Sequence, residues 1–168
     1  ISHIFSDLEV ILQVNRTFLH DLEGVLDRYT NYTIISSIIL SISPFFKTYS
    51  RYCNNYAKSQ STLAEAKKDS DIRPILLSME KDKRLSKGAL SSYLILPIQR
   101  IPRYRLLLQE LIKQTEKDHP DYENLHKALD SICKVAGHLN ATMKTLDRTN
   151  EIIQVQNKFT TEINLIEP

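Results

Sequence analysis

An amide and a guanidinium at helical spacing are the groups of this 168-residue chain best arranged for chemistry. In the segment LSSYLILPIQRIPRYRLLLQELIKQ (Leu90–Gln114), Ile95, Gln99 and Arg103 recur every four residues, which places them on one ridge of a helix. An aliphatic side chain, a carboxamide and a guanidinium in line suit the non-covalent recognition of another protein. The alternative is an ordinary solvated face on which Arg103 only favours solubility.

The nucleophiles and metal ligands of the chain show no spacing that would support covalent catalysis. The sequence has no GxSxG, HExxH or P-loop pattern, and its five histidines are scattered. Cys53 and Cys133 form no CxxC or Cys/His cluster. We therefore expect no covalent enzyme, no metal site, no other cofactor and no disulfide, and two isolated thiols fit a reducing cytoplasmic compartment.

The composition favours an all-α protein that binds neither nucleic acid nor membrane directly. Lys and Arg (22) nearly balance Asp and Glu (20), so the net charge of +2 provides no basic field for nucleic acid. No apolar run reaches the ~18 residues of a membrane span. Only three glycines are present, which argues against a fold of many short strands joined by tight turns.

Apolar residues at helical spacing predict five or six helices with short connections. The expected helices cover about residues 4–26, 34–57 with a kink or break at Pro44, a segment opening with a capping box at Ser61 or Thr62, a short helix from Ile72, then 90–117 and 120–153. Thr33 is a candidate N-cap, and an aromatic stripe is expected in the core: Phe45, Tyr49, Tyr52 and Tyr56. Helices of roughly 28 to 35 residues would be about 40–50 Å long, which indicates an elongated helical bundle.

The helix of the opening segment has two distinct faces when its residues are placed at about 100° intervals. The core-facing side holds Leu90, Leu94, Pro97, Ile98, Ile101, Tyr104, Leu108, Leu111 and Ile112. The outward side holds Ser92, Ile95, Gln99, Pro102, Arg103, Leu106, Glu110 and Lys113. Pro97 and Pro102 are expected to bend this helix, since an interior proline costs roughly 3 kcal/mol. Arg100 lies nearer the core side and is expected either to flank a docking surface or to tie helices together through a carboxylate.

The segment around Arg103 reads YLILPIQRIPRYRLLLQELIK, with Gln99, Arg100, Arg103, Tyr104 and Leu106–Leu108 at a characteristic spacing. It resembles the third conserved region of the Dbl-homology (DH) domain, the exchange module of guanine-nucleotide exchange factors for Rho-family GTPases. FFKTYSRYCNNYAKSQSTL is similar to the second conserved region, HPDYENLHKALDSICKVAGHLN to the helix after the third, and IFSDLEVILQVNRTFLHDLE to the helix after the first. The resemblance covers residues 1–155, and residues 156–168 look like a linker toward a pleckstrin-homology domain.

The resemblance implies a GTPase-binding surface made of Ile95, Gln99, Arg103, Leu106 and Asn140. Gln99, Arg103 and Asn140 match residues that contact switch 2 of the GTPase, and Ile95 matches a position that favours Rac-like partners. The implied activity is binding of a Rho-family GTPase through its switch regions and promotion of GDP release, with membrane recruitment only through other domains.

The sequence departs from the family pattern at two positions. Leu96 replaces a commonly basic residue, and Arg105 replaces a common proline. The glutamate of the first conserved region, which engages switch 1, lies on a helix that precedes this sequence. The alternative is therefore a catalytically weak or inactive helical scaffold that binds GTPases or other partners.

Overall fold

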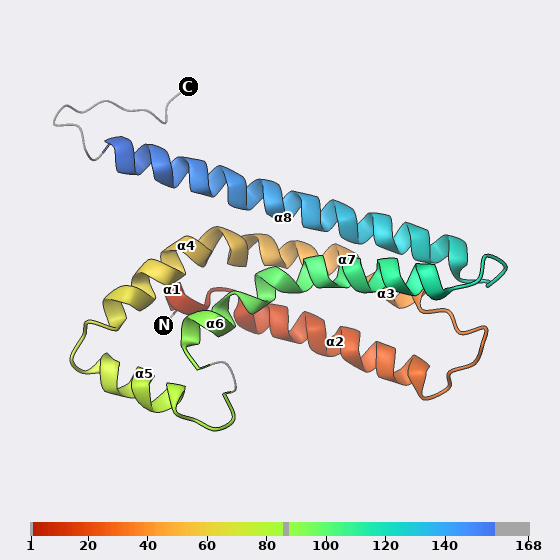
Figure 1. Cartoon of the computed structure of the whole chain (residues 1–168), viewed down its shortest axis with the longest axis horizontal. Helices are drawn as coiled ribbons and strands as arrows, with labels where there is room; N and C mark the ends of the chain where they lie inside the picture. Colours follow the sequence, from red (N-terminus) through yellow and green to blue (C-terminus); the bar gives the residue numbers. More distant parts are fainter. Residues whose placement is uncertain (1, 86–87, 157–168) are drawn as a thin grey trace.

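The computed structural model describes residues 2–85 and 88–156, and the regular structure in these ranges is helical throughout. The helices are α1 (Ser2–Phe5), α2 (Leu8–Leu26), α3 (Ser36–Ile42), the 3₁₀ helix η1 (Ser43–Thr48), α4 (Tyr49–Ala66), α5 (Ile72–Glu80), α6 (Leu90–Leu94), α7 (Leu96–Gln114) and α8 (Tyr122–Gln156). Figure 1 shows an elongated bundle along which α8 extends for most of the length. The predicted all-α class and elongated bundle are confirmed. The predicted linker lies outside the described residues, except for Gln156 at the end of α8.

The core joins α2, α3, η1, α4, α7 and α8 around a cluster of aromatic rings. Phe46 stacks on Tyr104 with ring centroids 5.5 Å apart, and Phe18 meets Tyr104 edge-on at 5.4 Å. Tyr49 and Tyr52 are buried as predicted, but Phe45 is 57% exposed. Residues 43–48 form a 3₁₀ helix of about three residues per turn, so Phe46 rather than Phe45 faces the core.

Two predicted features of the second and third helices are wrong. Ser61 begins no helix, because α4 continues through it to Ala66 and the Ser61 hydroxyl donates to the Lys58 carbonyl at 2.9 Å. Thr33 does not cap α3, because its hydroxyl accepts from the Thr30 amide at 2.7 Å.

The N-terminus of α3 is capped by Asp121, a residue 85 positions away from Ser36 in sequence. The buried Asp121 carboxylate accepts from the amides of Ile35 (2.8 Å) and Ser36 (3.0 Å) and from the Ser36 hydroxyl. It satisfies amides that the first turn of a helix leaves without partners. Asp121 therefore fastens the start of α3 to the chain just before α8.

The predicted single helix over residues 90–117 is divided at Ile95 into α6 and α7. Pro97 occupies the first turn of α7, where its missing N–H costs little, and Pro102 lies inside the helix. α7 ends at Gln114, because Thr115 adopts an extended conformation. The chain bends where the green α6 meets α7 (Figure 1), so the predicted bend is present and lies at the junction before Pro97.

A similar interruption separates the first two helices, which the sequence predicts as one. Ser6 has a positive φ of 46° between α1 and α2. α1 packs on α4 instead, since Asn55 donates to the His3 carbonyl (2.8 Å) and Ser59 to the Ile4 carbonyl (2.6 Å).

Of the helices in the described residues, none combines the length and apolar character needed to cross a bilayer.

Candidate functional site

The outward face of α7 carries the predicted recognition residues. Ile101, Leu108 and Ile112 are buried, which confirms the predicted core side of the helix. Among the predicted site residues on this helix and its junction, Gln99, Arg103 and Leu106 are exposed and Ile95 is half-buried.

Arg103 and Gln99 form a hydrogen-bonded pair on this face. The Arg103 Nη2 atom donates to Gln99 Oε1 at 3.2 Å, as their spacing of four residues allows. Among the residues whose side chains are described, no carboxylate lies within ion-pair distance of the Arg103 guanidinium. Its remaining N–H groups can therefore reach a partner's carboxylate or carbonyl oxygens.

Arg100 points toward α2 and not toward the outward face. Its Nε donates to the Tyr104 hydroxyl (2.7 Å) and to Asn15 Oδ1 (3.1 Å), and its guanidinium carbon lies 5.3 Å from the Tyr104 ring centroid. Arg100 therefore ties helices together, which was one of the two roles predicted for it. The expected carboxylate partner is wrong, because the acceptors are an amide oxygen and a phenol.

Asn140 is exposed on the edge of α8 that faces away from η1. Ser131 contacts Ser43 of η1 through their hydroxyls at 2.7 Å. Nine residues at about 100° each bring Asn140 to the opposite edge of the helix from Ser131. α7 packs on α8 and joins it through a short loop (Figure 1).

The position of Asn140 along the bundle sets the extent of the candidate surface. Asn140 lies about 27 Å from the start of α8 at ~1.5 Å per residue, and Arg103 lies about 17 Å from the end of α7. In two antiparallel helices, Asn140 is thus roughly level with Ile95 and about one or two turns from Arg103. A single surface that joins the predicted site residues of both helices, and its contacts with a partner, stay predictions.

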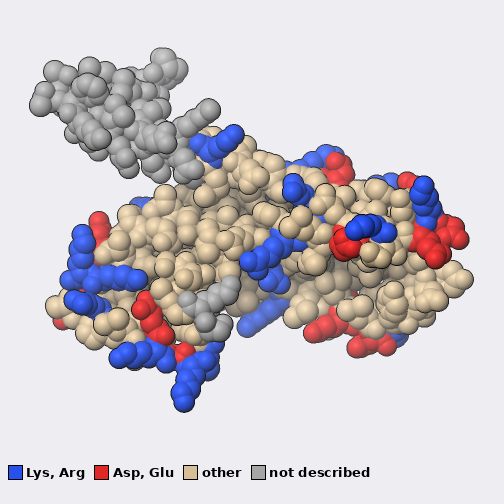
Figure 2. All heavy atoms as spheres, viewed as in Figure 1, with Lys and Arg blue, Asp and Glu red and all other residues tan. Residues whose placement is uncertain are grey.

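Basic side chains gather beside this surface. Arg100, Arg103 and Arg105 lie in the first half of α7, which has no acidic residue before Glu110. Figure 2 shows basic side chains over the first half of α7, while acidic side chains lie farther toward both ends of the molecule. Local potential here is positive although the net charge of the chain is only +2, which favours an acidic partner.

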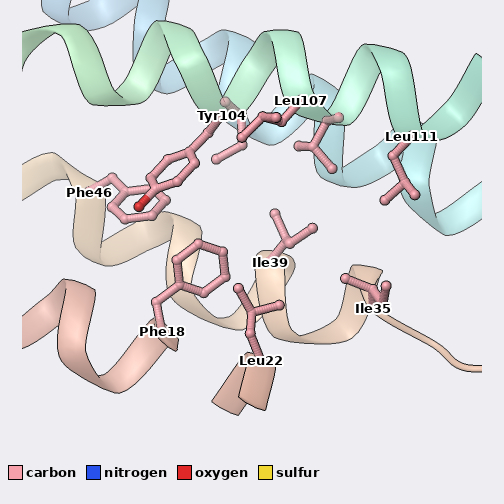
Figure 3. A pocket seen from close by; sticks show the side chains of 10 residues that line it. Phe18, Leu22, Ile35, Ile39, Phe46, Tyr104, Leu107 and Leu111 are labelled. Atoms are coloured by element: carbon pink, nitrogen blue, oxygen red, sulfur yellow. The ribbon is translucent and has the colours of Figure 1, made fainter. Parts of the chain in front are cut away.

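Two hollows follow the seam between α2 and α7, and we call them together the α2–α7 groove. The first, of about 470 Å³, is lined by Leu8, Ile11, Leu12, Asn15, Tyr49, Tyr93, Leu96, Pro97, Arg100 and Arg103. The second, of about 180 Å³, has apolar and aromatic walls from α2, α3, η1, α7 and α8, most of which Figure 3 labels. Leu107 at its rim is 66% exposed, and Leu19 of α2 is 56% exposed.

Leu107 is a residue of this groove that sequence reasoning missed. The Leu106–Leu108 run was the available signal, because three consecutive leucines on a helix cannot all face the same core. Leu108 is buried, whereas Leu106 and Leu107 are both more than half exposed.

The buried tyrosine and cysteine side chains of α4 stay protonated at neutral pH. Burial raises the pKa of Tyr49 to about 12, although a hydrogen bond from Asn15 lowers it, and burial raises the pKa of Tyr52 to about 12. The Tyr52 hydroxyl can thus donate to the Leu94 carbonyl, 2.8 Å away at the end of α6. Burial also raises the pKa of the free Cys53 thiol to about 11, which makes it a poor nucleophile.

Comparison with known proteins identifies the family. The chain matches the RhoGEF domain family over residues 1–140. It is 36% identical over 98% of its length to "Guanine exchange factor for Rac 30" of Dictyostelium discoideum and covers 10% of that protein. It is 31% identical over its whole length to human "FYVE, RhoGEF and PH domain-containing protein 6" and covers 12% of it. The chain belongs to the RhoGEF domain family, which confirms the predicted DH resemblance, and it spans about a tenth of these relatives.

Solved structures show the same fold. Autoinhibited Vav1 superposes with a TM-score of 0.87 at 24% identity, covering 97% of this chain and 30% of that chain. The complex of PDZ-RhoGEF DH/PH domains with GTPγS-activated RhoA superposes with a TM-score of 0.83 at 17% identity, covering 94% of this chain and 46% of that chain. The helical bundle is therefore that of DH domains.

Proposed function

We propose that this domain accelerates GDP release from a Rho-family small GTPase by binding its switch regions across α6, α7 and α8. The observation that carries the proposal is the exposed Gln99–Arg103 pair on α7, with Asn140 exposed on α8, the helix on which α7 packs. Membership of the RhoGEF domain family supports it, as do relatives named as exchange factors for Rac.

The proposed mechanism needs no covalent step. The domain binds the nucleotide-free GTPase more tightly than the GDP-bound form, and by linkage it lowers the affinity of the GTPase for GDP. Each tenfold loss of nucleotide affinity requires about 1.4 kcal/mol of differential binding. Several contacts over an interface of roughly 1,600 Å² would supply it, with Arg103 and Asn140 holding switch 2 in a displaced position.

Partner choice and location follow as finer proposals. Ile95, half-buried at the α6–α7 junction, offers an aliphatic contact that we assign to preference for Rac-like GTPases. We place the domain in the cytoplasm and assign membrane recruitment to other parts of the protein, since relatives carry the names of FYVE and PH domains.

We further propose that a helix preceding residue 1, corresponding to the first conserved region, packs along the α2–α7 groove. The walls of the second hollow are apolar and aromatic, Leu107 at its rim stands exposed, and Leu19 elsewhere on α2 is also exposed. Such a helix would cover these side chains and carry the family's switch 1 glutamate. The complete exchange surface would then combine three helices.

Release of a fluorescent GDP analogue from Rac-type and RhoA GTPases tests the proposal with the full-length protein. Arg103→Ala removes a charge-assisted contact worth about 1.5–3 kcal/mol, so release should slow by roughly 10- to 100-fold. Arg105→Ala is the matched control, because Arg105 is an exposed arginine of the same helix outside the proposed surface. Equal rates for the two variants would assign α7 no specific role. Unaccelerated release with wild-type protein would favour the scaffold.

A further inference from the structure

Asn15 of α2 is a polar junction that connects three parts of the bundle. Its Nδ2 donates to the Ile11 carbonyl (2.7 Å) and to the Tyr49 hydroxyl (2.7 Å). Its Oδ1 accepts from the Tyr104 hydroxyl (2.8 Å) and from Arg100 Nε (3.1 Å). A carboxamide has two donor hydrogens and two acceptor lone pairs, and all four are used here. The nitrogen of Asn15 thus faces its own helix and α4, and its oxygen faces α7.

The part of α7 that Asn15 contacts is short of backbone hydrogen bonds. Pro97 and Pro102 have no N–H, so the Ile98 carbonyl lacks the donor that residue 102 would normally supply. The helix is also interrupted just before, at Ile95. The rotation of this segment about its axis therefore depends more than usual on side-chain anchors.

Two groups of side-chain anchors hold the segment at its two ends. The Tyr52 hydroxyl fixes the Leu94 carbonyl at the end of α6. Asn15 fixes Arg100 and Tyr104, and the Tyr104 ring is held between Phe18 and Phe46. The Tyr104 hydroxyl therefore cannot swing away without disturbing the aromatic core.

Pinning Arg100 toward α2 determines where its neighbours point. At about 100° per residue, Gln99 and Arg103 lie roughly 100° and 60° from Arg100 around the helix. Both then face solvent, where they pair with each other. A rotation of the helix by one residue's angle would move this pair off the outward face.

We infer that Asn15 is a positioning residue of the exchange surface, which orients the first half of α7 so that Gln99 and Arg103 meet the GTPase. The expected effect of Asn15 on nucleotide exchange rests on the proposed function. Its structural part, the control of α7 by Asn15, does not depend on that function and can be measured separately.

Hydrogen exchange of backbone amides in the full-length protein tests the structural part. Asn15→Leu keeps the size of the side chain and removes every hydrogen bond to Arg100, Tyr104 and Tyr49. Asn55→Leu makes the same chemical change at an amide that links α4 to α1 and does not touch α7. We expect the backbone amides of residues 99–106, apart from Pro102, which has none, to exchange about tenfold faster or more in Asn15→Leu, in the manner of a local opening, and to stay unchanged in Asn55→Leu.

Nucleotide release from Rac-type and RhoA GTPases then tests the consequence. Asn15→Leu should slow release about tenfold, and combining it with Arg103→Ala should slow release little beyond Arg103→Ala alone, because the two act through one surface. Asn15→Asp retains the acceptor for α7 and should restore at least half of the rate. If Asn15→Leu acted only by lowering the stability of the bundle, it would slow nucleotide release by the same factor in the wild-type protein and in Arg103→Ala.

The outcomes separate the two claims. If amides 99–106 respond alike in Asn15→Leu and Asn55→Leu, the positioning role is overturned. If wild-type protein releases no nucleotide from any GTPase, the proposed function fails, while the amide comparison still decides whether Asn15 orients α7. Should Asn15→Leu not fold, Tyr104→Phe removes a single hydroxyl from the same junction and is subject to the same comparison.

Discussion

Replacing Asp121 by alanine should remove a large part of the stability of the bundle without touching the candidate surface. The Asp121 carboxylate is 1% exposed and accepts from the Ile35 amide, the Ser36 amide and the Ser36 hydroxyl. Hydrogen bonds to a charged group contribute about 1.5–3 kcal/mol each, and donors left buried without partners add to the loss. Since these terms are not additive, we expect a decrease of roughly 3–5 kcal/mol in the free energy of unfolding. That is a large fraction of the ~5–15 kcal/mol typical of a domain.

Urea unfolding followed by far-UV circular dichroism measures this change, because the domain is helical. Asp121→Ala should lower the midpoint while leaving the urea dependence of the free energy unchanged. Asp118→Ala is the matched control, since Asp118 is an exposed acid in the same loop and its removal should cost no more than about 0.5 kcal/mol. Asp121→Asn, which keeps one acceptor oxygen, should lie between the two. A loss of under about 1 kcal/mol in Asp121→Ala would refute the claim that this long-range cap holds α3 and α8 together.

Three further outcomes follow from burial and exposure. The unfolded Cys53 thiol loses its proton near its ordinary pKa of 9.0, while the folded thiol keeps it to about 11. The contribution of Cys53 to the free energy of unfolding should therefore be constant below pH 9 and fall by up to roughly 1.4 kcal/mol per pH unit between 9 and 11. Cys53→Ala should make the decline in pH-dependent urea titrations shallower, and the decline that is left above about pH 10 should come from groups such as Tyr49 and Tyr52, whose pKa burial raises to about 12. A thiol reagent should modify the half-buried Cys133 and spare Cys53 in the native protein, as mass spectrometry of the labelled peptides can show, and equal labelling would contradict the burial of Cys53. Leu107→Ser changes an exposed side chain at the rim of the α2–α7 groove. It should change the free energy of unfolding of a chain starting at residue 1 by no more than about 0.5 kcal/mol, but should destabilise a longer chain that carries the proposed preceding helix. Equal effects on both chains would argue against that helix in the groove.

The faces of α7 were predictable from sequence, because helical periodicity reports directly which side chains share a core. Ile101 and Leu108 are buried and Gln99 and Arg103 exposed, as the spacing predicts. The prolines indicated a bend, but not its place at Ile95, because Pro97 is compatible with the first turn of a new helix.

Contacts between residues distant in sequence were out of reach of such patterns. Thr33 was the local candidate for capping α3, whereas the capping carboxylate comes from Asp121. For Arg100 the sequence left two roles open, and for the one that ties helices together it suggested a carboxylate, whereas the acceptor on α2 is the amide of Asn15. A local pattern shows that a group needs a partner, but only the packing of helices selects which one.

The site residues came from the family resemblance more than from periodicity. An exposed asparagine near a helix edge carries no signal of its own, and Asn140 would have passed as a solvated side chain. In the bundle it is exposed on the edge of α8 opposite Ser131, which contacts η1, and α8 packs on the helix that carries Gln99 and Arg103.

The most direct test compares the affinities of the full-length protein for nucleotide-free and GDP-bound forms of a Rho-family GTPase. We predict a strong preference for the nucleotide-free form in the wild-type protein, and loss of most of that preference when Arg103 and Asn140 are both replaced by alanine in a protein that remains folded. A double variant that still prefers the nucleotide-free form as strongly as the wild type would contradict it.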